Sequence, residues 1–106
     1  MNNFFNFLGL VKRSGNIIEG YSKCDDYRNS TDIYLFVISN DLSDKSKSKF
    51  KKHCENKNIP YIEDFSKTEL GSPLGRKEVM LLGILDAGIA QKLIAIYEEE
   101  KYMGRE

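Results

Sequence analysis

Side chains that could bind a phosphate backbone or a nucleotide base occur in four short polar segments of this chain. Lysine and arginine could neutralise phosphates, serine and asparagine could hydrogen-bond base edges, and tyrosine could stack on a base turned out of its helix. The candidates for binding phosphate are Lys23, Lys67, Arg76 and Lys77. Ser22 and Asn40 are the candidates for contacts with base edges, and Tyr21 is the candidate for stacking. They make one site only if the fold brings their segments together.

A chain in which helices alternate with strands would bring these polar segments together. Apolar residues at three- and four-residue steps predict a first helix, which Gly15 ends, and the β-branched and aromatic run 33–38 predicts a central strand. The alternation predicts an α/β fold, a single-domain α-β-α sandwich, in which the loops after successive strands collect at one end of the sheet. The expected helices lie near residues 4–13, 21–29, 43–56, 66–70 and 86–97, and the expected strands near 16–18, 33–38, 59–62 and 79–85.

Composition favours one folded domain. The chain has 106 residues, 41% hydrophobic and 30% charged, and a net charge of zero, so it lacks the overall basic balance common in nucleic-acid-binding proteins. The charges are uneven, with six lysines against Glu55 over residues 45–57 and an acidic excess over 98–106. We expect the lysines to fan around the exposed side of their helix rather than form one stripe, and the simplest interpretation is a solubilising face.

Catalytic or metal-binding chemistry has little support in the sequence. Cys24 and Cys54 lack a metal-binding or nucleophile motif, and we expect two reduced thiols, with a disulfide or metal role as the alternative. His53 is the single histidine, and its place in a lysine-rich helix predicts an exposed side chain. We expect no enzyme, no cofactor and no metal; the alternative is a small enzyme that uses one cysteine with His53. The N-terminus has no basic leader and is too short to cross a bilayer, which predicts a cytoplasmic protein and no membrane partner.

Four stretches of the chain resemble a known family. Residues 7–16 resemble its first helix, and residues 33–41 its central strand with the acidic loop that follows. Residues 52–67 carry Cys-Glu before Ile-Pro-Tyr, and residues 68–75 carry the pattern Glu-Leu-Gly-x-x-x-Gly, which Gly71 and Gly75 complete. On these motifs the chain resembles the kink-turn RNA-binding family of ribosomal proteins, of the L-seven-Ae and L-thirty-e type, and especially its short bacterial members.

The resemblance implies an α-β-α sandwich with a four-stranded mixed sheet, formed by residues 4–97 and followed by a tail over 98–106. It also implies a non-enzymatic monomer that binds a bent, kink-turn-like RNA, either ribosomal RNA or another structured RNA, in association with the ribosome. The RNA-binding residues expected on this basis are Gly20, Tyr21, Ser22, Lys23, Asn40, Lys67, Arg76 and Lys77.

The chain departs from the family at one motif. The family pattern Gly-x-Asn-Glu-x-x-Lys begins at Gly20, but its Asn and Glu fall on Ser22 and Lys23, and its Lys falls on Asp26. A carboxylate in place of a lysine that faces phosphate reverses the local charge. The alternative is therefore that the fold is kept, RNA recognition is lost, and the same loop surface binds a protein partner.

Overall fold

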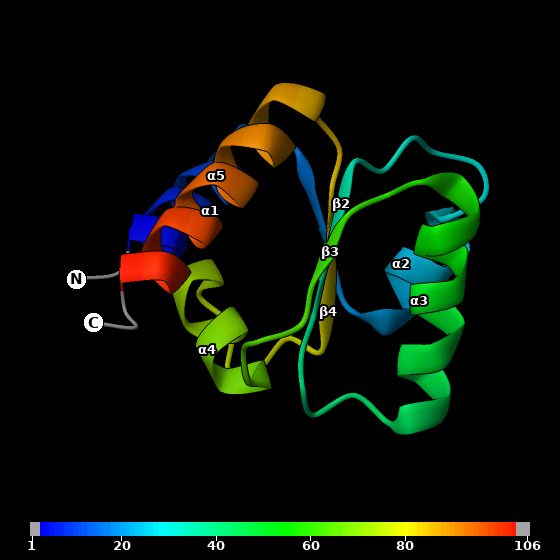
Figure 1. The fold of residues 1–106 in the computed structure, drawn as a ribbon. Coiled ribbons are helices and arrows are strands. Elements are labelled where there is room, and N and C mark those ends of the chain that lie inside the picture. Colours follow the sequence, from blue (N-terminus) through cyan, green and yellow to red (C-terminus); the bar gives the residue numbers. More distant parts are fainter. Residues whose placement is uncertain (1–2, 104–106) are drawn as a thin grey trace.

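The structure is a computed structural model and describes residues 3–103 of the 106. The last part of the expected tail, residues 104–106, lies outside the described residues. Helices and strands alternate along the chain as the sequence predicts (Figure 1). The elements are α1 (Asn3–Ser14), β1 (Ile17–Glu19), α2 (Tyr21–Tyr27), β2 (Leu35–Ile38), α3 (Asp44–Lys57), β3 (Tyr61–Ile62), α4 (Lys67–Gly71), the 3-10 helix η1 (Ser72–Leu74), β4 (Leu81–Ile84) and α5 (Ala87–Met103).

The four strands form one mixed sheet in the order β1-β4-β2-β3, which confirms the predicted fold class. β4 lies between β1 and β2 and is antiparallel to both, whereas β2 and β3 are parallel. The carboxyl ends of β1, β2 and β3 therefore lie at the same end of the sheet as the amino end of β4. We call this end the loop edge; it comprises residues 20–23, 39–41, 66–67 and 75–77.

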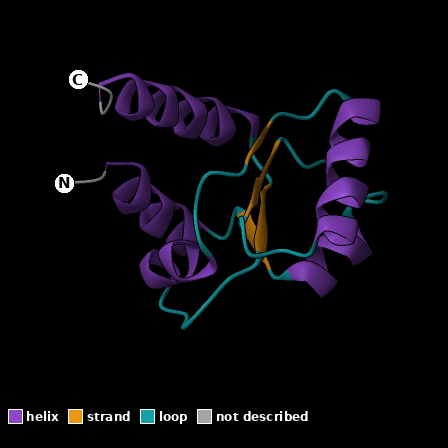
Figure 2. Ribbon diagram, turned by 60° about the horizontal axis from the view of Figure 1, so that its bottom comes forward, coloured by secondary structure: helices purple, strands orange, loops and turns teal. Residues whose placement is uncertain are grey.

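Helices cover both faces of the sheet (Figures 1 and 2). Helices α1, α4 and α5 pack on one face, around Phe4, Leu8 and Leu93, and enclose the larger core cluster. Helices α2 and α3 pack on the other face through Cys24, Phe50 and Cys54. Because both faces are covered, all four residues of β2 and all four of β4 are buried, as the continuous apolar run 33–38 predicts.

The expected elements differ from the observed ones mainly at their ends. Strand β4 begins at Leu81 because the Val79 N–H donates to the Lys67 carbonyl, at the start of α4, instead of joining the sheet. Helix α5 continues to Met103, and its Glu100 accepts hydrogen bonds from the Asn3 and Phe4 backbone N–H groups. A carboxylate at this position caps the first turn of α1.

One expectation about α3 is wrong, and another is refined. His53 is buried, with 6% of its surface exposed, because it shares the inner side of the helix with Phe50 and Cys54. The lysines fan around the solvent side as expected, with Lys47 and Lys51 on the opposite flank from Lys49, but three of them share one side. Lys45, Lys49 and Lys52 are exposed at positions i, i+4 and i+7, so they lie on one side of the helix.

Candidate nucleic-acid interface

The loop edge begins at Gly20, which ends β1 and starts α2. Its backbone has a φ of 96°, a conformation that side chains strongly disfavour, and its N–H donates to the Leu81 carbonyl at 2.7 Å. Helices α3 and α4 also begin at this edge, and their first turns are capped by the side chains of Ser43 and Ser66. The first turn of α2 has no side-chain cap. Its backbone N–H groups can therefore face an anion at this edge.

Gly71 and Gly75 fix the loop that precedes β4. A Cβ at Gly71 would lie 2.8 Å from Glu78 Cα and 2.9 Å from the Arg76 carbonyl oxygen, so only glycine lets this loop pack on α4. Gly75 has a φ of 70°, in the left-handed region. The Gly-x-x-x-Gly pattern thus acts through the backbone, and it holds Arg76 and Lys77 at the loop edge.

Hydrogen bonds and ion pairs join the segments of the edge. Arg76 Nε lies 2.9 Å from Glu19 Oε1, which ties the loop before β4 to the end of β1. The Lys67 N–H donates to Asp41 Oδ2 at 2.9 Å, and the Asn40 N–H donates to the Phe65 carbonyl at 2.8 Å. The structure therefore places the eight expected residues at one end of the sheet, from Gly20, Tyr21, Ser22 and Lys23 to Asn40, Lys67, Arg76 and Lys77.

Carboxylates that the sequence analysis did not assign to the site neutralise two of its cations. Glu19 pairs with Arg76, and it also lies 3.2 Å from Lys12 Nζ. Burial tends to raise the pKa of Glu19, but hydrogen bonds from Arg76 and Lys12 outweigh it, so the pKa lies below its ordinary value. Lys67 Nζ lies 3.5 Å from Glu78 Oε2. No local pattern marks Glu19 as a partner of Arg76, because only the packing of β1 beside β4 brings them together.

Lys23 and Lys77 are the exposed cations of the edge for which no ion pair occurs among residues 3–103. Ser22 and Asn40 are also exposed. These four side chains are therefore accessible to a ligand that approaches the edge.

Tyr21 is less accessible than base stacking requires. Its ring is half-buried and meets the Phe50 ring edge-on, with the centroids 5.4 Å apart. The Lys49 ammonium lies 3.3 Å from its hydroxyl oxygen. Tyr21 therefore belongs to the contact between α2 and α3, and stacking on a base remains a prediction that needs part of this ring to open to the ligand.

The candidate nucleophiles are buried where α2 and α3 pack on the sheet. Cys24 and Cys54 are free and buried, and burial raises the pKa of each thiol to about 12. Both therefore stay protonated near neutral pH, which argues against a cysteine nucleophile. Residues 3–103 contain no group of three side chains placed to hold a metal ion. None of the helices described in the structure has the length and apolar character to span a membrane.

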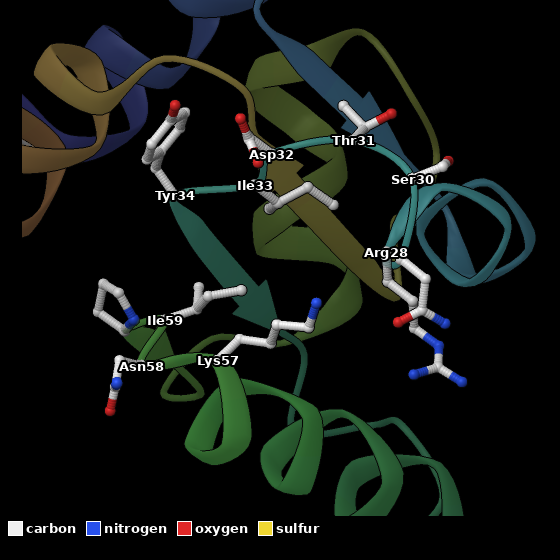
Figure 3. A pocket seen from close by; sticks show the side chains of 11 residues that line it. Arg28, Ser30, Thr31, Asp32, Ile33, Tyr34, Lys57, Asn58 and Ile59 are labelled. Atoms are coloured by element: carbon white, nitrogen blue, oxygen red, sulfur yellow. The ribbon is translucent and has the colours of Figure 1, made fainter.

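A hollow of about 390 Å³ lies at the opposite end of the sheet, between the loops that precede β2 and β3. Figure 3 shows Ser30 and Thr31 on one side of it and Lys57 and Asn58 on the other. Helices α2 and α3 end beside this hollow, and helix C-termini carry partial negative charge. The helix dipoles therefore favour an anion at the loop edge over an anion in this hollow.

Residues 3–94 match the Ribosomal protein L7Ae/L30e/S12e/Gadd45 family. The chain is 33% identical over 94 residues to the RNA-binding protein YlxQ of Enterococcus faecium, covering 88% of this chain and 89% of that protein. It is 24% identical over 95 residues to the RNA-binding protein YlxQ of Bacillus subtilis (strain 168), covering 90% and 95% of the two chains.

Two solved structures share the fold. One is a protein of unknown function from Bacillus halodurans, with a TM-score of 0.86 and 24% identity over 92% of this chain and 99% of that one. The other is the Giardia lamblia 15.5kD RNA binding protein, with a TM-score of 0.68 and 21% identity over 87% and 85% of the two chains. With residues 3–94 matched and the fold shared, the chain belongs to the Ribosomal protein L7Ae/L30e/S12e/Gadd45 family.

Proposed function

We propose that this protein binds structured RNA through the loop edge and catalyses no reaction. The observation that carries the proposal is the convergence of the four polar segments at one end of the sheet, beside the uncapped first turn of α2. The names of the YlxQ relatives, both RNA-binding proteins, support the same ligand.

The preferred ligand would be an RNA with a sharp, kink-turn-like bend. Gly20 lets a phosphate approach the backbone N–H groups of α2, and Ser22 and Asn40 offer hydrogen bonds to base edges or sugars. Lys23 and Lys77 supply positive charge, and Arg76 and Lys67 add more once phosphate competes with Glu19 and Glu78. Recognition of this kind reads the shape of the RNA more than its sequence.

A ribosomal RNA is the proposed natural ligand, bound by a monomer in the cytoplasm. One chain supplies all four segments of the loop edge, so a second copy is not needed to complete the site. The competing function is a protein-binding module on the same edge. Asp26 and the two ion pairs that reduce the positive charge of the edge favour that alternative.

A binding titration separates the two functions. A bent RNA with an internal loop and a straight duplex of the same length are titrated with the protein over a range of salt concentrations. RNA binding predicts tighter binding to the bent RNA, a steep loss of affinity with salt, and weaker binding by Arg76→Ala and Lys67→Ala. Lys92→Ala, which removes an exposed cation on α5, is the matched control. Equal affinity for bent and straight RNA at low salt would leave the protein-binding function in place.

A further inference from the structure

The two helical layers differ in charge. Helix α3 carries six lysines and two carboxylates, whereas α5, on the other face of the sheet, carries two lysines and three glutamates. The zero net charge of the chain therefore hides a basic side formed by α3. Most of these lysines do not belong to the loop edge, because they lie farther along α3 from it.

Three of the lysines form a stripe on α3. Lys45, Lys49 and Lys52 are exposed, lie on one side of the helix, and span about 10 Å along its axis at 1.5 Å per residue. We call them the α3 stripe. Lys49 Nζ lies 2.9 Å from Asp25 Oδ1 of α2. The side chains of Lys45 and Lys52 make no ion pair or hydrogen bond within residues 3–103.

The stripe is continuous with the loop edge. Helix α3 follows β2, so Lys45 lies at the edge and Lys52 lies farther from it. Lys49 Nζ reaches the hydroxyl of Tyr21, the residue after Gly20, at 3.3 Å. Lys47, on the opposite flank of α3 from the stripe, donates to the Asn40 carbonyl at 2.9 Å. Lys45 and Lys49 thus place the stripe next to the loop edge and the first turn of α2, and Asp25 of α2 pairs with Lys49.

We propose that the α3 stripe binds the phosphate backbone of a helical stem of the same RNA whose bend is held at the loop edge. This inference rests on the proposed function and extends its contact surface. Lysines are strongly hydrated point charges on flexible stems, so they suit phosphates of any sequence better than a shaped pocket. The exposed residues of α3 beside these lysines are Ser48, Glu55 and Asn56, all polar, so this side of α3 offers a protein partner no apolar side chain to bury, which favours a polyanion.

The test uses two RNAs with the same bend, one whose stem stops at the bend and one whose stem continues for a full helical turn. The variant Lys45→Gln/Lys49→Gln/Lys52→Gln is compared with Arg13→Gln/Lys92→Gln/Lys101→Gln, which removes three exposed cations from α1 and α5. Both variants lose the same charge. Circular dichroism melting checks that both remain folded.

The stripe variant should lose affinity for the long-stem RNA by about ten- to a hundredfold near 0.1 M salt, and its salt slope should fall by roughly 2 to 3. For the short-stem RNA, its affinity should stay close to that of the control variant. Equal losses in the two variants on the long stem would overturn the inference while leaving the proposed function intact. A natural protein that does not prefer bent RNA would overturn both. Unchanged RNA affinity, together with lost binding of an acidic protein, would assign the stripe to a protein partner.

Discussion

Arg76 donates a hydrogen bond to Glu19 at 2.9 Å, and this pair fixes the loop before β4 against the end of β1. Lys12 joins the same carboxylate from α1 and also donates to the Leu74 carbonyl at 2.6 Å. Glu19 thus links the first helix, the first strand and the Gly71–Gly75 region. Only 16% of its side-chain surface is exposed, so solvent screens these contacts incompletely.

The Glu19 contacts predict a pH-dependent contribution to stability. The pKa of Glu19 is lower in the folded protein than in the unfolded chain, so its contribution is complete above the ordinary value of 4.5 and is lost as the pH falls through the folded pKa. We expect Glu19→Gln to cost about 1 kcal/mol of unfolding free energy at pH 7. Urea denaturation at decreasing pH should show the two proteins converging in the acid range. A difference that stays constant down to pH 3 would contradict this assignment.

Gly71 and Gly75 should respond differently to alanine. At Gly71 the added methyl group meets the backbone of Glu78 and Arg76 at 2.8–2.9 Å, so Gly71→Ala should lower the unfolding free energy by about 1–3 kcal/mol. At Gly75 the methyl group meets no atom within 4 Å, and only the left-handed φ of 70° opposes it, at about 1–2 kcal/mol. Urea denaturation measures the unfolding free energy of both variants.

The two variants also differ in a second measurement. Because Gly71→Ala displaces backbone, it should raise hydrogen exchange at residues 76–78, whereas Gly75→Ala should leave the backbone positions of those residues nearly unchanged. If Gly71→Ala unfolds at the same urea concentration as the natural protein, the loop does not pack on α4 as closely as described.

Local sequence patterns predicted the order of elements because each strong element carries a clear signal. The apolar run 33–38 is typical of a strand covered on both faces, and Ser66 and Glu69 form the capping box that starts α4. The convergence of the loop segments follows from the alternation for the first three strands. For the segment 75–77 it depends on β4 being antiparallel, and no local pattern encodes that direction.

The details that sequence reasoning missed depend on partners distant in the chain. His53 has the residue type and lysine-rich surroundings of an exposed position, but its spacing from Phe50 turns it inward beneath Arg28. Glu19 and Glu78 pair with cations that only the folded sheet brings near. The α3 stripe is the exception, because the i, i+4, i+7 spacing of Lys45, Lys49 and Lys52 indicates it from the sequence itself.

His53 provides a second pH-dependent contribution to stability. Burial lowers the pKa of His53, and the positive charges of Arg28 and Lys57 lower it further, so the imidazole is neutral at pH 7. The neutral ring can accept from Arg28 through Nδ1, at 3.3 Å. The unfolded chain binds its proton first, so stability should be complete above the ordinary pKa of 6.5 and fall as the pH drops below it.

Two measurements check the lowered pKa of His53 and its effect on stability. The chain has one histidine, so its NMR titration is unambiguous and should give a midpoint below 6.5. The unfolding free energy of the natural protein should fall between pH 7.5 and pH 5.5, whereas that of His53→Gln should change less. A midpoint near 6.5 would mean that solvent reaches the ring, and one above 6.5 that a carboxylate does; either would conflict with its burial.

Asp26 tests how the second helix meets RNA. Asp26 is exposed on α2, at the position where the resemblance expects a phosphate-facing lysine. Asp26→Lys should therefore tighten binding to a bent RNA by about five- to tenfold near 0.1 M salt and steepen the salt dependence by roughly 0.9. Asp32→Lys makes the same change of charge beside the hollow at the opposite end of the sheet, and it should change the affinity much less. Equal gains from the two substitutions would show a general effect of net charge, and no gain from Asp26→Lys would show that α2 does not face the phosphates.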